Sequence, residues 1–137
     1  MDQSLFAFEP AKPPGQMHPL ALAYLGDAIY EMYIRQYVLS QQNHRPDHLH
    51  RESVGYVSAK AQARLLAEWL PLLTEEELGV VKKGRNAKSG KAPKSADVLD
   101  YRHSTGFECL IGYLYYERRH ERLKQLLDMA TGEIGGL

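Results

Sequence analysis

The sequence predicts a single all-α domain. Apolar residues recur at helical spacing in several segments, helix-capping residues precede some of them, and no segment alternates apolar and polar residues long enough to form a strand. The chain has 137 residues, of which 44% are apolar and 25% are charged, as is ordinary for one globular domain. A chain of this length can bury enough surface to fold without disulfides or structural zinc.

The N-terminal third is predicted to contain an arm and two helices. Residues 1–17 are rich in proline and lack periodicity, so we expect a flexible arm. Pro19 fits the first turn of a helix that runs to about Leu39, because proline lacks only an N–H that would have no partner there. A short helix is expected to begin near Asp47, which can act as its N-cap.

The middle of the chain is predicted to contain two more helices. The segment 54–70 is amphipathic over its whole length, which predicts one helix that ends before Pro71. Thr74 and Glu77 have the spacing of a capping box, so a further helix is expected from Glu75 toward Gly84.

The last third is predicted to be helical as well. Asp97 is a candidate N-cap for a helix that runs to about Arg119, and a final helix is expected over 120–131. The predicted domain is therefore 18–131, followed by a C-terminal tail of residues 132–137.

Several protein classes are excluded by composition. A single cysteine excludes an internal disulfide and any zinc site with two thiolates from one chain. No apolar stretch reaches the length of a membrane span, and the N-terminus lacks the pattern of a signal peptide. We therefore expect a cytoplasmic protein that does not contact a membrane.

Basic residues are concentrated in one segment, although the formal net charge of the chain is zero. Residues 82–94 contain no acidic residue, and their cations are Lys82, Lys83, Arg85, Lys88, Lys91 and Lys94. Such a segment on an otherwise acidic chain is typical of contact with a nucleic-acid backbone, and a solvated loop is the alternative. Its glycine, serine and proline residues predict a loop. The spacing of Gly84 and Gly90 does not match a nucleotide-binding P-loop.

Two acidic residues lie within apolar helical segments. Asp27 occurs in LALAYLGDAIYEMY and Glu108 in STGFECLIGYLYY. An ionised carboxylate in such surroundings is costly unless an arginine or a divalent cation such as Mg²⁺ or Mn²⁺ compensates it. Taken alone, the residues favour the arginine and leave the cation open. Glu31 is expected to pair with Arg35 one turn later, and a supporting role near the metal is the alternative.

Two glycines suggest how these acids could meet. Gly26 precedes Asp27, and Gly112 lies one turn after Glu108. Glycine is unfavourable within a helix but permits close approach of a neighbour. If the two helices cross at these glycines, the two acids become neighbours.

Histidine and cysteine residues do not indicate a further site. His44, His48 and His50 lie close in sequence, but Pro46 interrupts their spacing and no cysteine is nearby to complete a zinc site. Cys109 lies in an apolar run and is expected to be a small buried hydrophobic residue.

The two acidic segments resemble the motifs of the ribonuclease III family. LALAYLGDAIYE (20–31) is similar to the family signature, and STGFECLIGYLY (104–115) is similar to its second acidic motif. The segments GRNAKSGKAPK and YRHSTGFE further resemble the Mini-ribonuclease III subfamily, which lacks a double-stranded RNA-binding domain. The resemblance covers about 18–131.

This resemblance implies an all-α homodimer that hydrolyses double-stranded RNA with Mg²⁺, for which Mn²⁺ can substitute. It implies 5′-phosphate and 3′-hydroxyl product ends and precursor 23S ribosomal RNA as the substrate. Asp27 and Glu108 match the family's catalytic metal ligands. With no separate RNA-binding domain, the basic segment 82–94 is the candidate RNA contact.

The chain departs from ordinary family members at two positions. Ala23 and Thr105 stand where those members carry a glutamate and an aspartate. These departures, shared by the subfamily, leave the number of metal ions open. They also favour one alternative, an inactive ribonuclease III-like RNA-binding module. A helical dimer that only scaffolds protein partners is a second alternative.

Overall fold

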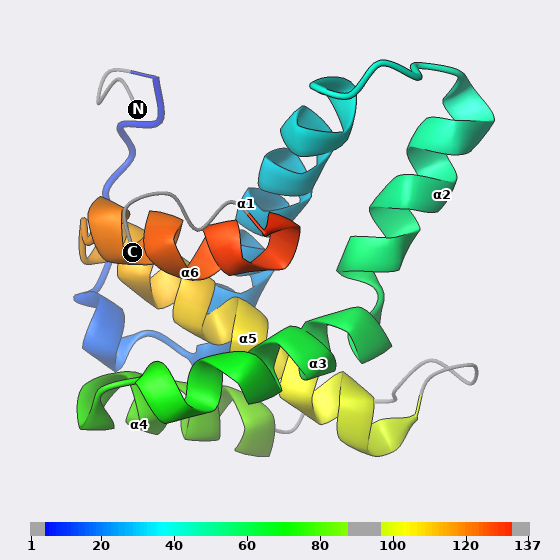
Figure 1. Cartoon of the computed structure of the whole chain (residues 1–137). Coiled ribbons are helices and arrows are strands. Elements are labelled where there is room, and N and C mark those ends of the chain that lie inside the picture. The colour runs from blue at the N-terminus through cyan, green and yellow to red at the C-terminus, as the bar shows by residue number, and fades with distance from the viewer. Residues whose placement is uncertain (1–4, 88–96, 133–137) are drawn as a thin grey trace.

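The computed structural model describes residues 5–87 and 97–132 (Figure 1). These residues form helices joined by short connections and contain no strand, so the prediction of an all-α fold is confirmed. The helices are α1 (Pro19–Leu39), α2 (Pro46–Val57), α3 (Ala59–Trp69), α4 (Glu75–Asn86), α5 (Val98–Tyr116) and α6 (His120–Thr131), with short 3-10 helices at Pro14–Gln16 and Leu70–Leu72.

Helix α5 is the centre of the core. Ten of its residues are buried, and it contacts α1, α3, α4 and α6. In Figure 1 it runs through the middle of the molecule, with α3 and α4 below it and α6 above it. Any side chain that α5 presents to α1 is therefore held in a rigid frame.

An aromatic cluster joins four helices at this centre. The ring of Phe107 on α5 stacks on Trp69 of α3 with centroids 4.5 Å apart. Its other neighbour is Tyr30 of α1, which meets it edge-on at 4.9 Å. The indole N–H of Trp69 donates to the carbonyl oxygen of Leu126 on α6 at 3.0 Å. Such aromatic pairs stabilise a core beyond the area that they bury.

Most predicted helix ends are confirmed. Helix α1 begins at Pro19 as expected. Thr74 and Glu77 form the predicted capping box, in which each side chain accepts from the other residue's backbone N–H. Asp97 caps α5 through two hydrogen bonds from backbone N–H groups. These caps are local interactions, which explains why the sequence alone predicts them.

The prediction of one helix over 54–70 is wrong. Helix α2 ends at Val57, and Ser58 takes an extended conformation with φ −62° and ψ 154° before α3 begins. The Ser58 hydroxyl accepts from the Ala61 N–H at 3.2 Å, so it acts as an N-cap and allows a new helix to start in another direction.

The expected N-cap of α2 is also wrong. Arg45 occupies the cap position and Pro46 the first turn, which proline favours, so Asp47 lies inside the helix. At the other end of α3, Pro71 lies in the 3-10 turn that follows the helix, as its role as a helix terminator requires.

The predicted basic loop is helical in its first part. Lys82, Lys83 and Arg85 belong to α4, which continues to Asn86. Gly84 packs directly on α5: a Cβ there would lie 2.7 Å from the Cβ of Cys109. Close packing of α4 on α5 therefore overrides the local preference of the glycine for a loop. Lys88, Lys91 and Lys94 lie outside the described residues.

Helix α2 differs from the other helices because none of its residues is buried. It packs mainly on α1 and forms a hairpin with it that projects from the rest of the molecule (Figure 1). Within the described part of the chain, no helix is both long and apolar enough to cross a membrane.

Candidate active site

Helices α1 and α5 cross at two glycines. A Cβ on Gly26 would lie 1.8 Å from the carbonyl oxygen of Glu108, and a Cβ on Gly112 would lie 2.1 Å from the carbonyl oxygen of Leu22. Both distances are far below any real contact of a Cβ, and the obstructing atoms are backbone atoms that cannot move aside. Glycine is thus required on both helices, and the predicted crossing is confirmed.

This crossing brings Asp27 and Glu108 together. Asp27 follows Gly26 on α1 and is exposed, whereas Glu108 on α5 is partly buried. Burial, followed by the nearby carboxylate of Asp27, raises the pKa of Glu108 to about 8, and the charge of Glu31 contributes to the same shift. Although Asp27 lies in an apolar segment of the sequence, its side chain is exposed, so burial affects mainly Glu108.

The structure does not support an arginine as the compensating partner. Among the described residues, no lysine or arginine forms an ion pair with Asp27 or Glu108. Arg35 binds Glu31 at 3.0 Å, as the sequence predicts. Neither of the two acids is therefore compensated by one of these basic side chains.

The two carboxylates fit a hard divalent cation. Mg²⁺ prefers oxygen ligands and is commonly bound through one or two carboxylates while it keeps several waters. The described residues contain no cluster of three or more histidine, cysteine, aspartate or glutamate side chains arranged for a metal. The described residues thus offer a pair of carboxylates and not a complete set of protein ligands for a metal ion.

The two positions at which the chain departs from the family pattern supply no carboxylate to the site. Ala23 is buried on α1 and carries no oxygen in its side chain. Thr105 is also buried, and its hydroxyl donates to the carbonyl oxygen of Tyr101 one turn earlier on α5 at 3.0 Å. The Thr105 side chain is thus engaged within its own helix.

Sequence reasoning missed Gln62, which lies beside Glu108. The side-chain amide of Gln62 hydrogen-bonds to the Glu108 carboxyl and lowers its pKa, against the larger effects of burial and Asp27. Gln62 is 2% exposed and shares the buried face of α3 with Leu65, Leu66 and Trp69. Because Gln62 lies at helical spacing from the apolar residues of α3, the sequence alone could have indicated a buried polar side chain at this position.

The start of α4 holds a second pair of acids with opposite surroundings. Glu77 is buried and accepts hydrogen bonds from Arg122 at 2.8 and 2.9 Å, which lower its pKa. Glu76 is exposed and accepts from Tyr113 at 2.5 Å and from Arg119 at 2.8 Å, which also lowers its pKa. Each of these acids is paired with an arginine, as expected for structural carboxylates.

The basic residues of the segment 82–94 that the structure describes lie at the end of α4, which packs on α5 at Cys109. Lys82 and Lys83 are exposed at the end of α4, and Arg85 is partly exposed. The charge of Lys83 acts on the thiol of Cys109, the residue after Glu108, although burial dominates and raises the pKa of that thiol to about 12. Cys109 is thus a buried hydrophobic residue as predicted, and the end of α4 lies close to the site-bearing part of α5.

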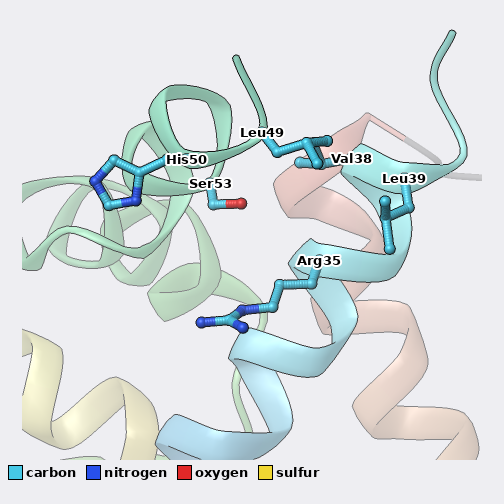
Figure 2. A pocket seen from close by; sticks show the side chains of 6 residues that line it. All are labelled: Arg35, Val38, Leu39, Leu49, His50 and Ser53. Atoms are coloured by element: carbon cyan, nitrogen blue, oxygen red, sulfur yellow. The ribbon is translucent and has the colours of Figure 1, made fainter. Parts of the chain in front are cut away.

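The remaining candidates do not form a second site. The ring of His44 hydrogen-bonds to the carbonyl oxygens of Leu39 and Gln41, in keeping with a structural role. A hollow of about 340 Å³ lies between the end of α1 and α2. Figure 2 shows the residues that line it: Arg35, Val38, Leu39, Leu49, His50 and Ser53. This hollow contains none of the predicted site residues.

Comparison with known proteins identifies the family. A family model described as the ribonuclease III domain matches residues 20–119. Curated relatives named Mini-ribonuclease 3 include one from Brevibacillus brevis, 47% identical over 93% of this chain and 96% of its own, and one from Enterococcus faecalis, 51% identical over 88% and 92%. A crystal structure of a protein from Fusobacterium nucleatum is also similar, with a TM-score of 0.80 and 30% identity over 89% of this chain and 98% of the other.

The matched region spans both helices that supply Asp27 and Glu108, together with the crossing that joins them. The chain therefore belongs to the ribonuclease III family of endoribonucleases.

Proposed function

We propose that the protein is a Mg²⁺-dependent endoribonuclease that cleaves double-stranded RNA at the Asp27–Glu108 site. One observation carries this proposal: two acids from distant motifs meet at a glycine crossing, and no described basic side chain is paired with either. An enzyme has a reason to retain such an arrangement, because an uncompensated carboxylate pair costs stability in a protein that does not use it.

The two acids would have different tasks in phosphodiester hydrolysis. A divalent cation held here supplies positive charge against the charge that develops on the phosphoryl group and lowers the pKa of water. Asp27 is exposed, so it can reach a cation that also contacts the RNA strand. Glu108 is fixed on the rigid central helix, so it sets the position of the site. Hydrolysis in line with the 3′-oxygen leaves a 5′-phosphate and a 3′-hydroxyl.

Substitution of Asp27 tests the catalytic assignment. Asp27→Asn keeps the size of the side chain but removes its charge, so we expect cleavage to fall by at least about 100-fold, because even groups that only support metal ligands contribute about 10- to 100-fold. Cleavage of an end-labelled RNA duplex with Mg²⁺ or EDTA measures this effect.

Asp47→Asn on α2 is the matched control, and we expect wild-type cleavage from it. Wild-type turnover by Asp27→Asn would refute the assignment. If the wild-type protein binds the duplex but does not cleave it under any metal condition, the inactive RNA-binding module replaces the proposed function.

We infer that the basic segment 82–94 contacts the RNA backbone. A-form RNA offers phosphates and 2′-hydroxyl groups and not a readable major groove, so lysines suit this contact. Each lost lysine–phosphate contact reduces the dependence of log K on log salt by roughly one unit. We therefore expect Lys88→Ala combined with Lys91→Ala to weaken binding and to flatten this slope.

Duplex binding is measured across salt concentrations in the Asp27→Asn background, which prevents cleavage. Lys124→Ala is the control, because this lysine is already paired with Asp128 within α6. An unchanged slope in the double variant would remove the segment from the RNA interface.

We further propose that the active form is a cytoplasmic homodimer that matures the ends of precursor 23S ribosomal RNA. Large apolar side chains are exposed on α1 and α2, which supports an interface there: Tyr24, Met32, Leu39 and Val54. One site on each subunit would let a dimer cut both strands of a duplex. Sedimentation measures the assembly, and mapping of cleaved precursor ends tests the substrate.

A further inference from the structure

The lysine and arginine side chains of this protein fall into two groups that differ in their partners. Each of those on α1, on α2 and its N-cap, on α6 and in the α5–α6 turn forms an ion pair with an acidic side chain. Those on α3, α4 and α5 form no ion pair with any residue that the structure describes: Lys60, Arg64, Lys82, Lys83, Arg85 and Arg102. Lys12, which precedes the helices, is also unpaired within that part of the chain.

The unpaired cations of the helices come from elements that pack on one another. Helix α5 contacts both α3 and α4, and Figure 1 shows the start of α3 and the start of α5 at the same end of the molecule. A Cβ on Gly106 of α5 would lie 3.5 Å from the backbone nitrogen of Arg85 on α4, and Arg102 lies one turn before Gly106. The cations of α3 and α5 therefore adjoin the described part of the basic segment 82–94.

Acidic residues are present on α3 and at the start of α5, but they do not compensate these cations. Glu68 lies one turn after Arg64, and Asp97 and Asp100 lie at the start of α5, where a helix N-terminus favours negative charge. Asp97 accepts hydrogen bonds from two backbone N–H groups. None of the three acids forms an ion pair with a described basic residue.

The stability of α3 does not explain its two cations. Lys60 and Arg64 are both exposed and lie one turn apart, a spacing at which like charges destabilise a helix. Unpaired cations suit a polyanion instead, because a paired cation must give up its carboxylate before it binds a phosphate. An unpaired cation has no such contact to lose, and binding releases the counterions of the nucleic acid.

We propose that Lys60, Arg64 and Arg102 bind phosphates of the duplex RNA and so extend the contact of the segment 82–94 onto α3 and α5. This inference rests on the proposed function. Arg102 precedes Glu108 by six residues, which is about 9 Å along α5, so the contact begins close to the cleavage site. A-form RNA is recognised mainly through its phosphates and 2′-hydroxyl groups, which suits cations presented by several helices.

The salt dependence of duplex binding tests this role. Fluorescence anisotropy with a labelled RNA duplex measures the affinity of the full chain across salt concentrations, in the Asp27→Asn background. Lys60→Ala combined with Arg64→Ala should weaken binding and flatten the slope of log K against log salt by roughly two units, one for each lost phosphate contact. Arg102→Ala should flatten the slope by roughly one unit.

Arg45→Ala combined with Arg51→Ala is the matched control. It removes the same net charge from two exposed arginines that already face Asp47, each at 3.8 Å, so the slope should not change. Lys60→Arg combined with Arg64→Lys keeps both charges and should keep the slope of the parent chain. With Asp27 intact, the variant that lacks Lys60 and Arg64 should raise KM for the duplex and leave kcat unchanged, as expected for a contact that only binds substrate.

An unchanged slope after loss of Lys60 and Arg64, or an equal flattening in the Arg45 and Arg51 control, would overturn the proposal. This failure is distinguishable from failure of the proposed function. If the wild type cleaves the duplex while the slope does not depend on Lys60, Arg64 or Arg102, the nuclease stands and only the extended contact is lost. If the chain neither binds nor cleaves the duplex at low salt, both are refuted.

Discussion

Two pairs of acids in this molecule lie in opposite electrostatic surroundings. At the start of α4, Glu76 and Glu77 are each paired with an arginine of the α5–α6 region, and the pKa of each is lowered. At the crossing of α1 and α5, Asp27 and Glu108 face each other, and the pKa of Glu108 is raised to about 8. Both Glu77 and Glu108 are at least partly buried, so the opposite directions of their pKa shifts come from their different partners.

This difference separates acids that stabilise the fold from acids that are available for chemistry. The carboxylate of Glu77 accepts hydrogen bonds from Arg122 and from the backbone N–H of Thr74 in the capping box, so its charge is already compensated by a cation. Glu108 is held beside another acid instead. The free-energy cost of placing Glu108 beside another acid must be offset by the stability of the surrounding core. Such locally unfavourable groups are usual at functional sites.

The largest expected effect is at the paired acids. Arg122→Ala leaves the Glu77 carboxylate buried without its cation, which should lower the free energy of unfolding by about 3–5 kcal/mol. Glu108→Gln should not lower the stability of the metal-free protein, because it removes a carboxylate that none of the described basic residues compensates.

Urea denaturation at one fixed protein concentration measures both variants. Equal losses of stability in Arg122→Ala and Glu108→Gln would contradict the distinction between acids that stabilise the fold and acids that do not.

The second effect concerns the crossing that holds the unpaired acids. Gly26→Ala places a methyl group against the backbone of α5, and it should cost about 3 kcal/mol, the upper end of the usual range for overpacking. Gly79→Ala on α4 is the matched control, since a Cβ there meets nothing within 4 Å. It should stabilise the protein by about 0.5–1 kcal/mol, because alanine is the better helix former.

Thermal denaturation of the two glycine variants measures this contrast. Tolerance of Gly26→Ala without loss of stability would mean that α1 and α5 do not approach as closely as the structure has them.

The smallest expected effect is a dependence on pH. Hydrogen bonds from Arg122 lower the pKa of Glu77 in the folded protein below its unfolded value. The stability from this pair is therefore fully present above the unfolded pKa, about 4.3, and is lost as the pH falls through the lower folded value. Urea midpoints between about pH 6 and pH 3 should fall more steeply for the wild type than for Glu77→Gln. Parallel curves would contradict the assignment of Glu77 as a paired structural acid.

Local interactions explain what the sequence by itself determined. The capping box of Thr74 and Glu77, the cap at Asp97 and the start of α1 at Pro19 each depend on residues within one helical turn. Asp27, Glu108 and their neighbouring glycines could also be recognised from the sequence, because acids and glycines are unfavourable within apolar helices.

Only the tertiary structure decided how these parts meet. The break at Ser58, the helical state of Lys82 and Lys83 and the exposure of Asp27 all depend on packing between helices that are distant in the sequence. Gln62 shows most clearly what the sequence does not predict. The sequence shows a polar residue among the apolar positions of α3, but its contact with Glu108 on another helix follows only from the packing of α3 on α5. Hydrogen bonds within a turn are set by nearby residues, whereas a site at a helix crossing exists only after the core has fixed the helices against each other.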